Sequence, residues 1–408
     1  MQLPNSIFHS YDIRGKYPHE LSDHIALLLG KSVGTYVICH IKPHETPSAC
    51  VGRDPRESGE PLKENFVRGL TSTGCNVIDL GICTTPMINF GGYTFKVSSQ
   101  ISITASHINE DYNGFKISCN LRPFTQHDYQ ELKKIVEIGK YERGKGQVER
   151  KNIESDYLKS IYDSVSVEPD KIAQLSQTLG ISQDTDGDRL IVKSVDGDLL
   201  SAIFSSSILE KHNGSKIVLN VASSQAVIDY ITKHGGKVIL SKTGYPNIMA
   251  VMEKEGAIFG GEISGHYYFK DKHLGYSDGL YSAARLCEIL ETKRVTLQQL
   301  VRQIPQYFAK DEIRVKLPEN KNAHTVVKDI IQSAHNTFSD ANFLEIDGAR
   351  VTFQNKSWFL IRASGTENVI SLRIESKTKS GLAGLTKILQ KLLKKHGINV
   401  IIGVLLAF

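Results

Sequence analysis

The sequence predicts an α/β protein whose C-terminal part changes to an α+β pattern. Over most of the 408 residues, short apolar runs alternate with segments of helical period. This alternation is typical of parallel sheets covered by helices. In the C-terminal part, strand patterns outnumber helical ones, which predicts a sheet with helices packed on it. The length is sufficient for several domains.

The first part of the chain shows the alternation clearly. The predicted elements are a helix over 20–40, a strand over 48–52, a helix over 58–72, a strand over 76–80, a helix after Thr85-Pro86 and a strand over 100–104. In parallel sheets, active loops leave the carboxyl ends of strands. The loop after the strand over 100–104 is therefore a candidate functional loop.

A polar segment over 140–151 marks a predicted boundary, after which further elements follow. They are helices near 154–165 and 169–178, a loop over 182–189 entering a strand, a turn at Asp196-Gly197, strands over 217–221, 237–241 and 257–261, and helices over 223–235, 247–256 and 277–291. The C-terminal part has predicted strands over 313–317, 343–346, 351–353, 358–362 and 370–375, helices near 323–337 and 383–396, and a hairpin turn over 353–358.

Composition excludes several classes of protein. The chain is 40% hydrophobic and 23% charged with a net charge of +5, which is ordinary for a globular protein. This charge is too small for a nucleic-acid footprint, although it suits an anionic small substrate. The six cysteines form no CxxC pair, so we expect reduced thiols and a cytoplasmic location. The apolar C-terminal stretch over 397–408 is too short to span a membrane and is expected to be a docked or frayed tail.

The loop TASHINEDYNGFK over 104–116 carries Ser106, His107 and Lys116. It follows the apolar run over 101–103 and contains an Asn-Gly turn signal. One interpretation is a surface loop with a capping serine. The other is a nucleophile placed at the end of a buried strand. The loop alone does not decide between them.

Three carboxylates, Asp184, Asp186 and Asp188, are spaced by two residues. On an extended segment, this spacing places the side chains on one face. Such a group requires a cation, and oxygen ligands suit Mg²⁺ or Ca²⁺. An EF-hand is excluded because Arg189 stands where that loop requires glycine. A haloacid-dehalogenase-type phosphatase is disfavoured because residues 181–183 make a poor apolar strand, and a solvated acidic turn is the plain alternative.

The stretch GGEISGH over 260–266 places Glu262, Ser264 and His266 at alternating positions after an apolar strand. Carboxylate and hydroxyl groups are suited to sugar hydroxyls. The alternative is a polar turn.

The stretch RASGTEN follows a strand and offers a cradle for phosphate. Arg362 supplies a fork of donors, and Ser364, Thr366 and the backbone amides near Gly365 can complete it. The alternative is a hairpin loop with an exposed arginine. Further basic residues, including Arg14 and Lys242, stand in short motifs that alone indicate only surface charge.

The order of these motifs resembles that of the α-D-phosphohexomutase family. YDIRG, GRDPRESG, TASH followed by DYNGFK, DTDGDR, GEISGH and RASGTE occur in the family's sequence order. The segment from GEISGHYYFK to RLCEIL is most similar to the phosphomannomutase/phosphoglucomutase branch. The resemblance extends from Phe8 to about Glu375.

The resemblance implies three α/β domains with mixed sheets and a C-terminal α+β domain around a central cleft. The expected domains are 1–139 with the phosphoserine loop, 140–213 with the metal loop, 214–305 with the sugar loop and 306–408 with the phosphate loop. It also implies a monomeric enzyme without a nucleic-acid or membrane partner.

The resemblance further implies reversible phosphoryl transfer between a hexose 1-phosphate and a hexose 6-phosphate, with glucose or mannose as the sugar. A phosphoserine, Mg²⁺ and a hexose 1,6-bisphosphate intermediate would take part. The implied catalytic residues are Ser106, His107, Lys116, Arg14 and Arg189, with Lys116 or His107 as acid or base. The implied metal ligands are Ser106, Asp184, Asp186 and Asp188, and the implied substrate-binding residues are Lys242, Glu262, Ser264, His266, Arg362, Ser364, Gly365 and Thr366.

Four departures from the family pattern bear on activity. Ile108-Asn109 stands where the family usually has Asn-Pro, Asn368 replaces a usual proline, and Tyr245 stands where this branch often has histidine. The fourth is that no strand–turn–helix–strand unit is predicted between the helix near 154–165 and the aspartates, so the second domain is expected to be shortened. Two alternatives remain, a phosphoglucosamine mutase and a sugar-phosphate-binding pseudoenzyme.

Overall fold

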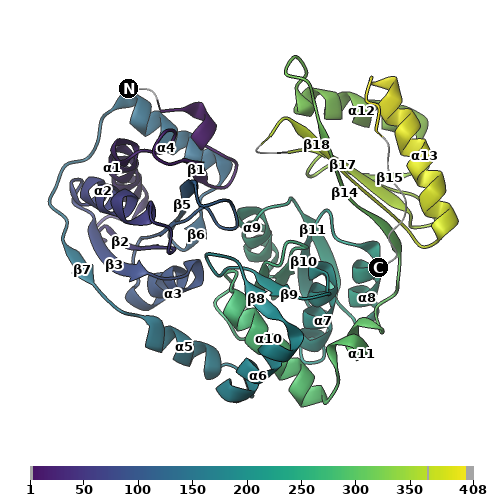
Figure 1. Cartoon of the computed structure of the whole chain (residues 1–408), viewed down its shortest axis with the longest axis horizontal. Helices are drawn as coiled ribbons and strands as arrows, with labels where there is room; N and C mark the ends of the chain where they lie inside the picture. The colour runs from purple at the N-terminus through teal and green to yellow at the C-terminus, as the bar shows by residue number, and fades with distance from the viewer. Residues whose placement is uncertain (1–2, 365–366, 401–408) are drawn as a thin grey trace. The chain divides into compact units, whose positions relative to one another are not determined.

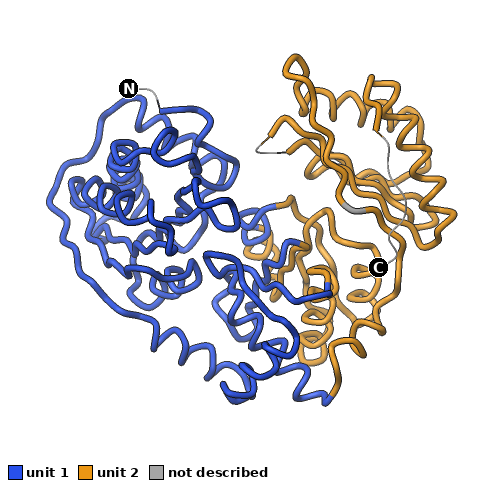
Figure 2. The backbone as a smooth tube through the Cα atoms, viewed as in Figure 1, with its two compact units in different colours: residues 1–195, 244–250, 264–294 blue, residues 196–243, 251–263, 295–408 orange. Residues whose placement is uncertain are grey.

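A computed structural model describes residues 3–364 and 367–400. The chain divides into two compact units (Figure 2). Unit 1 comprises residues 1–195, 244–250 and 264–294, and unit 2 comprises residues 196–243, 251–263 and 295–408. No helix in the described part of the chain is both long enough and apolar enough to span a bilayer. Most of the predicted C-terminal tail, residues 401–408, lies outside the described residues.

Unit 1 is built on a mixed sheet with the strand order β1-β5-β4-β2-β3-β7 (Figure 1). Strands β4, β2, β3 and β7 run parallel, whereas β5 pairs antiparallel with both β4 and β1, and β6 pairs with β5. The strands are β1 (Ile13–Lys16), β2 (Ser48–Arg53), β3 (Asn76–Ile82), β4 (Ser99–Ile103), β5 (Tyr112–Cys119), β6 (Arg122–Pro123) and β7 (Val148–Arg150). The helices around this sheet are α1 (Asp23–His40), α2 (Gly59–Thr71), α3 (Thr85–Phe95) and α4 (Gln126–Ile138), and η1 (Asn5–Ile7) precedes β1.

Both faces of this sheet are buried because helices cover each of them. Along β2, Ala49 and Val51 belong to one apolar cluster and Cys50 belongs to another. The first cluster includes residues of α1, α2 and α4, and the second includes Ile88 of α3. Successive side chains of a strand point to opposite faces, so a continuous apolar run fits a strand between two helical layers. Every residue of β4 is buried, which places the following loop at the end of a fixed element.

Sequence signals explain where the helices begin. The side chain of Ser22 accepts a hydrogen bond from the Ile25 amide and caps α1. The side chain of Thr84 accepts from the Met87 amide and caps α3, whose first turn contains Pro86. Proline is favoured at the start of a helix. The predicted helix after Thr85-Pro86 is confirmed, since α3 begins at Thr85.

The segment after β7 contains few elements. It comprises α5 (Glu154–Tyr162), α6 (Pro169–Leu179) and a two-stranded antiparallel sheet of β8 (Ile181–Gln183) and β9 (Leu190–Val192). Between α5 and β8 the structure has the single helix α6, as the sequence predicts. Unit 1 is completed by β13 (Tyr267–Phe269) and α10 (Gly279–Lys293), and α10 packs against α5, α6, β8 and β9. The small β8–β9 sheet therefore has α10 as its covering helix.

Unit 2 contains a parallel sheet and a separate antiparallel sheet. Strand β10 (Lys216–Asn220) pairs in parallel with β11 (Lys237–Ser241) and β12 (Phe259–Gly261), with helices α7 (Gly197–Leu209), α8 (Gln225–Lys233) and α11 (Leu297–Val301). Helix α9 (Tyr245–Glu255) is divided between the two units. The antiparallel sheet has the order β14-β18-β17-β16-β15. It consists of β14 (Phe308–Lys316), β15 (Asn342–Leu344), β16 (Ala349–Thr352), β17 (Trp358–Ala363) and β18 (Val369–Ser376), with α12 (Ala323–Thr337) and α13 (Lys379–Lys395).

The C-terminal α+β pattern is confirmed, including the hairpin between β16 and β17. The predicted turn at Asp196-Gly197 is wrong because Asp196 caps the N-terminus of α7 through a hydrogen bond from the Asp198 amide. The units change at residue 196, so the expected boundary between 213 and 214 lies inside unit 2, after α7. The division into four domains stays a prediction.

Candidate active site

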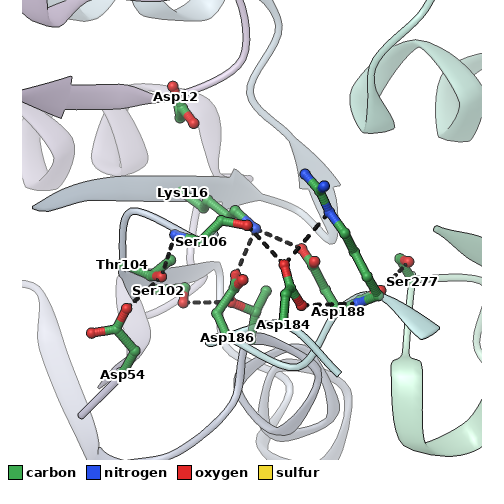
Figure 3. Close-up of polar contacts among 12 residues, drawn as sticks. Asp12, Asp54, Ser102, Thr104, Ser106, Lys116, Asp184, Asp186, Asp188 and Ser277 are labelled. Atoms are coloured by element: carbon green, nitrogen blue, oxygen red, sulfur yellow. Dashed lines mark hydrogen bonds and ion pairs between the residues drawn. The ribbon is translucent and has the colours of Figure 1, made fainter. Parts of the chain in front are cut away.

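Ser106 lies three residues beyond Ile103, the last residue of β4, with Thr104 and Ala105 between them. Its Oγ donates a hydrogen bond of 2.9 Å to Oδ2 of Asp184 (Figure 3). The residue has a φ of +52°, in the left-handed region that non-glycine residues rarely adopt. We expected an exposed serine at the top of an open loop, and this is wrong because Ser106 is only 2% exposed. The loop folds down onto the sheet and aims the hydroxyl at the aspartates.

Asp184, Asp186 and Asp188 converge, although not by the expected geometry. The segment is a turn between β8 and β9 instead of an extended strand. The Gly187 amide donates to the Asp184 carbonyl at 3.1 Å, and Gly187 has a φ of +75°. One ligand atom from each aspartate lies within 4.8 Å of the others. A tight turn therefore brings the three carboxylates together, whereas the sequence predicted an extended segment with all three on one face.

The carboxylate cluster fits a hard divalent cation. Its donors are carboxylate oxygens, the ligands that Mg²⁺ and Ca²⁺ prefer. Asp186 is 1% exposed, and its Oδ1 has no hydrogen-bond partner among the described residues. A buried polar atom without a partner is costly, so this oxygen is suited to a metal ion.

Lys116 reaches this cluster from β5. Its Nζ donates to Oδ2 of Asp186 at 2.6 Å and to Oδ2 of Asp188 at 2.5 Å (Figure 3). Burial disfavours the charge on Lys116, but the two carboxylates outweigh burial and raise the pKa of the lysine. The same ammonium acts against burial at Asp188 and holds the pKa of that carboxyl well below its usual range. In this arrangement Lys116 keeps its proton at neutral pH.

The first turn of α3 and the N-terminus of α10 support the aspartate turn. Oγ1 of Thr85 lies 2.8 Å from Oδ2 of Asp186, and the Thr85 amide donates to the Asp186 carbonyl at 2.8 Å. From the other side, Oγ of Ser277 donates to the Asp188 carbonyl at 2.6 Å. The Gly279 amide donates to the carbonyl of Gly187 at 3.0 Å. The turn is thus fixed by residues outside the shortened segment.

Positive and negative groups alter the pKa values around Ser106. Burial raises the pKa of Asp184 to about 6, and the neighbouring Asp188 and Asp186 charges add to the increase. Nε of Arg189 lies 3.5 Å from Oδ2 of Asp184. Nδ1 of His107 lies 3.4 Å from Oγ of Ser106. Burial, then Arg189, Arg14 and Lys116, lower the pKa of His107 to about 4, so its imidazole is neutral at neutral pH.

His266 joins the sugar-loop residue Ser264 to the aspartate cluster. Nε2 of His266 lies 3.3 Å from Oδ1 of Asp188, and its Nδ1 lies 2.9 Å from Oγ of Ser264. Arg14, on β1, pairs with Asp12 at 2.5 Å. The structure therefore brings the catalytic candidates, the aspartates, Ser264 and His266 into unit 1.

The remaining substrate-binding candidates belong to unit 2. Lys242 is exposed, whereas Glu262 is 1% exposed at the end of β12. Nε of Arg362 lies 3.1 Å from Oδ2 of Asp347, which also accepts from the Thr243 amide at 3.3 Å. The Ser364 amide donates to the Val369 carbonyl at 2.8 Å. Gly365 and Thr366 lie outside the described residues.

Sequence reasoning missed two residues at the site. Thr85 was used only as a helix-start signal, and Arg56 was only part of the GRDPR motif. Arg56 is 7% exposed, and its guanidinium binds carbonyls of the Ser106 loop. The available signal was the place of Arg56 in GRDPRESG, one of the motifs that carry the family resemblance.

Comparisons with known proteins agree with this fold. Models of phosphoglucomutase/phosphomannomutase match residues 5–142 as α/β/α domain I, residues 196–308 as α/β/α domain III and residues 312–390 as the C-terminal domain. The third-domain match begins at residue 196, where the units also change.

Individual relatives match over nearly the whole chain. A phosphomannomutase/phosphoglucomutase of Pseudomonas syringae pv. tomato is 29% identical, with 96% of each chain covered. A phosphoglucomutase of Neisseria gonorrhoeae is 30% identical, with 93% of this chain and 95% of the relative covered. A crystal structure of a phosphoglucomutase/phosphomannomutase family protein from Burkholderia thailandensis has a TM-score of 0.85 at 24% identity, covering 99% of this chain and 100% of that one.

The fold, the matched models and the named relatives define an α/β enzyme. The chain belongs to the phosphoglucomutase/phosphomannomutase family. The alignment to the Pseudomonas relative extends over 454 residues, more than the 408 of this chain. That relative therefore has positions without a counterpart here, which is in keeping with a shortened segment.

Proposed function

We propose that this chain catalyses reversible phosphoryl transfer between a hexose 1-phosphate and the corresponding hexose 6-phosphate, with glucose or mannose as the sugar. Ser106 carries the phosphoryl group. The observation that carries this proposal is the 2.9 Å hydrogen bond from Oγ of Ser106 to Asp184 within the three-carboxylate cluster. A plain capping serine has no need of such a cluster.

The proposed reaction has two transfers. In the first, the bond between phosphorus and Oγ of Ser106 breaks, and a bond to O6 of the hexose 1-phosphate forms. The proton of the 6-hydroxyl leaves as the new bond forms, and the serine oxygen receives a proton. The resulting hexose 1,6-bisphosphate then returns the phosphoryl group from O1 to Ser106. Positioning and charge stabilisation supply most of the rate in such transfers.

Asp184, Asp186 and Asp188, together with the oxygen on Ser106, are the residues that would hold Mg²⁺. The bound ion would neutralise charge on the transferring phosphoryl oxygens. The partnerless Oδ1 of Asp186 supports this assignment. The Lys116 ammonium contacts two of the three carboxylates, those of Asp186 and Asp188.

Lys116 and His107 have different suitability for proton transfer. The carboxylates raise the pKa of Lys116, which suits this lysine to donating a proton or a hydrogen bond to a phosphoryl or serine oxygen. His107 is neutral at neutral pH and lies 3.4 Å from the serine oxygen, so it can accept a hydrogen bond there. Arg189 and Arg14 supply positive charge close to His107 and suit an anionic substrate.

The substrate-binding assignments in unit 2 rest on the family's motifs. Glu262, with Ser264 and His266 of unit 1, is proposed for sugar hydroxyls. Arg362 and Ser364, with Gly365, Thr366 and Lys242, are proposed for the phosphate that does not react. Nε of Arg362 lies 3.1 Å from Oδ2 of Asp347, and a guanidinium is suited to phosphate as well as to carboxylate oxygens.

The hydrogen bonds of the aspartate turn argue against the pseudoenzyme alternative. That alternative rests on the shortened segment, which could leave the metal loop poorly supported. The turn instead receives hydrogen bonds from Thr85, Ser277 and Gly279, none of which belongs to the shortened segment. The metal ligands can therefore be held without the missing unit.

A coupled mutase assay tests the proposal. The purified protein receives glucose 1-phosphate or mannose 1-phosphate, Mg²⁺ and a trace of the hexose 1,6-bisphosphate. We expect turnover that falls by at least about 10³-fold in Ser106→Ala, because the phosphoryl carrier is lost. Ser160→Ala is the matched control, since its hydroxyl donates to the Tyr157 carbonyl within α5. Full turnover in Ser106→Ala would exclude the phosphoserine mechanism.

The sugar is settled by the same assay with glucosamine 1-phosphate as a third substrate. We expect a larger kcat/KM for the glucose and mannose phosphates. A larger value for the glucosamine phosphate would make the chain a phosphoglucosamine mutase. Binding of all three, measured by calorimetry, without turnover in protein phosphorylated at Ser106 would restore the pseudoenzyme alternative.

A further inference from the structure

Arg56 binds the loop of Ser106 more extensively than any motif suggested. It follows β2 in the GRDPR motif and is 7% exposed. A guanidinium has five N–H donors, and here every one of them has an acceptor within the molecule. The acceptors are Oδ2 of Asp54 at 2.9 Å and the carbonyls of Ser106 at 2.7 Å, Ile108 at 2.7 Å, Asn109 at 2.8 Å and Tyr112 at 3.1 Å.

Four of these acceptors are carbonyls of one short loop. Apart from them, the loop has few hydrogen bonds of its own. The Ile108 amide donates to the Ala105 carbonyl at 3.3 Å, and the Tyr112 amide donates to the Asn109 carbonyl at 3.0 Å. A single side chain therefore supplies much of the polar contact that shapes residues 106–112.

The contact with Ser106 closes a ring of hydrogen bonds. The Ser106 amide donates to Oγ1 of Thr104 at 2.8 Å, and that hydroxyl donates to Oδ2 of Asp54 at 2.7 Å (Figure 3). The same Oδ2 accepts from Nε of Arg56, whose Nη2 binds the Ser106 carbonyl. The amide and the carbonyl of Ser106 are thus both held, one on each side of its Cα.

This ring acts on a residue in an unfavourable conformation. Ser106 has a φ of +52°, where a side chain crowds its own backbone. Such a conformation persists only where the surroundings impose it. Because the direction of the Cα–Cβ bond follows from φ, the ring also sets where Oγ points. Released to a negative φ, the serine would turn its hydroxyl away from Asp184.

We propose that Arg56 is a positioning residue, which holds Ser106 in its left-handed conformation and so directs Oγ toward Asp184. This inference rests on the proposed function, in which Ser106 carries the phosphoryl group. Arg56 itself touches no reacting atom. Its effect should therefore appear in the rate of phosphoryl transfer and not in the binding of the hexose phosphate.

The test uses full-length Arg56→Met and Arg56→Lys with Lys63→Met as the matched control. Lys63 is equally buried in unit 1 and pairs with Asp79 at 3.0 Å, away from the loop. The protein is phosphorylated with radiolabelled glucose 1,6-bisphosphate, and label transfer to glucose 1-phosphate is followed in a single turnover. A misplacement of about 1 Å is able to cost about 10²-fold in rate. We expect about a 10²-fold loss in Arg56→Met, a smaller loss in Arg56→Lys and less than about threefold in Lys63→Met.

Two further measurements separate positioning from folding. The KM for glucose 1-phosphate should stay within about threefold of the parent in Arg56→Lys while kcat falls. Thr104→Val opens the same ring at another point, so its effect and that of Arg56→Lys should be less than additive in the double variant. Arg56→Lys serves where Arg56→Met does not fold, as judged by circular dichroism.

The measurements distinguish a failure of the positioning role from a failure of the proposed function. Loss of transfer in Ser106→Ala together with a parent-like rate in both Arg56 variants would overturn the positioning role alone. Fully additive effects of Thr104→Val and Arg56→Lys in the double variant would also overturn it. So would an equal loss of transfer rate in Lys63→Met. Transfer that survives in Ser106→Ala would instead overturn the phosphoserine mechanism on which the inference rests.

Discussion

The Nζ atom of Lys116 lies 2.6 Å from Oδ2 of Asp186; the aspartate side chain is buried and the lysine side chain is 11% exposed. The lysine comes from β5, and the aspartate comes from the turn between β8 and β9. Their ion pair joins the Ser106 sheet to the aspartate turn within unit 1. A buried cation between carboxylates stabilises the turn, and a bound metal ion is able to take over that role.

Lys116→Met should destabilise the metal-free protein and increase its response to Mg²⁺. Removing one partner of a buried ion pair costs about 3–5 kcal/mol in the free energy of unfolding. Because Asp186 and Asp188 are then left without their cation, Mg²⁺ should restore much of the loss. Urea unfolding with EDTA and with Mg²⁺ measures both effects. Lys63→Met breaks a buried pair elsewhere in unit 1, and an equal Mg²⁺ response in both variants would contradict the prediction.

Thr85→Val should weaken Mg²⁺ binding without unfolding the protein. The Thr85 hydroxyl contacts Oδ2 of Asp186 at 2.8 Å and Oγ of Ser102 at 2.7 Å. Groups that orient metal ligands typically contribute 10–100-fold to metal affinity, so we expect a loss of roughly that size. Calorimetric titration with Mg²⁺ measures it. Thr71→Val, whose hydroxyl bonds backbone carbonyls of its own helix, should bind as the parent does, and parent-like affinity in Thr85→Val would refute this role.

Asp198→Asn should remove a pH-dependent loss of stability. Burial raises the pKa of Asp198 from 3.8 to about 6, with Arg373 acting against it and Asp196 with it. The folded state then binds a proton that the unfolded state has released, so stability falls as pH rises between about 4 and 6. Above pH 6 the loss is complete, and it amounts to about 2–3 kcal/mol at most.

The measurement is the difference in unfolding free energy between the parent and Asp198→Asn from pH 4 to pH 7. We expect the unfolding free energy of Asp198→Asn to increase relative to that of the parent as pH rises through this window. Asp229 is the matched control because hydrogen bonds from Gln225, Lys356 and Tyr307 outweigh its burial and lower its pKa. Asp229→Asn should lose stability relative to the parent as pH rises. If the difference in unfolding free energy between Asp198→Asn and the parent does not change with pH, the pKa of Asp198 is not raised.

Asn368→Ala should destabilise unit 2 at the start of α12. Oδ1 of Asn368 accepts from the Ala323 amide at 2.9 Å, and its Nδ2 donates to the Lys321 carbonyl at 2.8 Å. Loss of such a capping contact costs about 1 kcal/mol. Asn368→Asp keeps the acceptor at a helix N-terminus and should lose less. Urea unfolding of both variants checks this, and an equal loss would show that the acceptor oxygen contributes nothing.

Local patterns predicted much of the secondary structure. The helix expected over 323–337 is α12 (Ala323–Thr337), and the strand expected over 237–241 is β11 (Lys237–Ser241). Both elements have signals within a few residues, namely the Asn322 cap and an apolar run. The antiparallel β5 was not predicted; it pairs with β4, the strand before it in the chain, and with the distant β1, where Ile13 lies opposite Phe115.

For the candidate site, too, the sequence predicted some features and not others. Residue types and motif order identified Ser106, Lys116 and the three aspartates, since carboxylates, hydroxyl and ammonium indicate their chemistry wherever they stand. The sequence could not show that Ser106 is buried with a positive φ, or that the aspartates meet through a turn. Arg56 contacts the Ser106 loop and Thr85 contacts Asp186, and these partners lie 50 and 101 residues away along the chain.

The sequence by itself thus determined the family, the class of chemistry and most of the helices and strands. Tertiary structure alone decided how the reactive groups are aimed and what holds them. The physical reason is that propensity, capping and apolar period act over a few residues. Hydrogen bonds such as that from Arg56 to Ser106 form only after the chain has brought distant segments together.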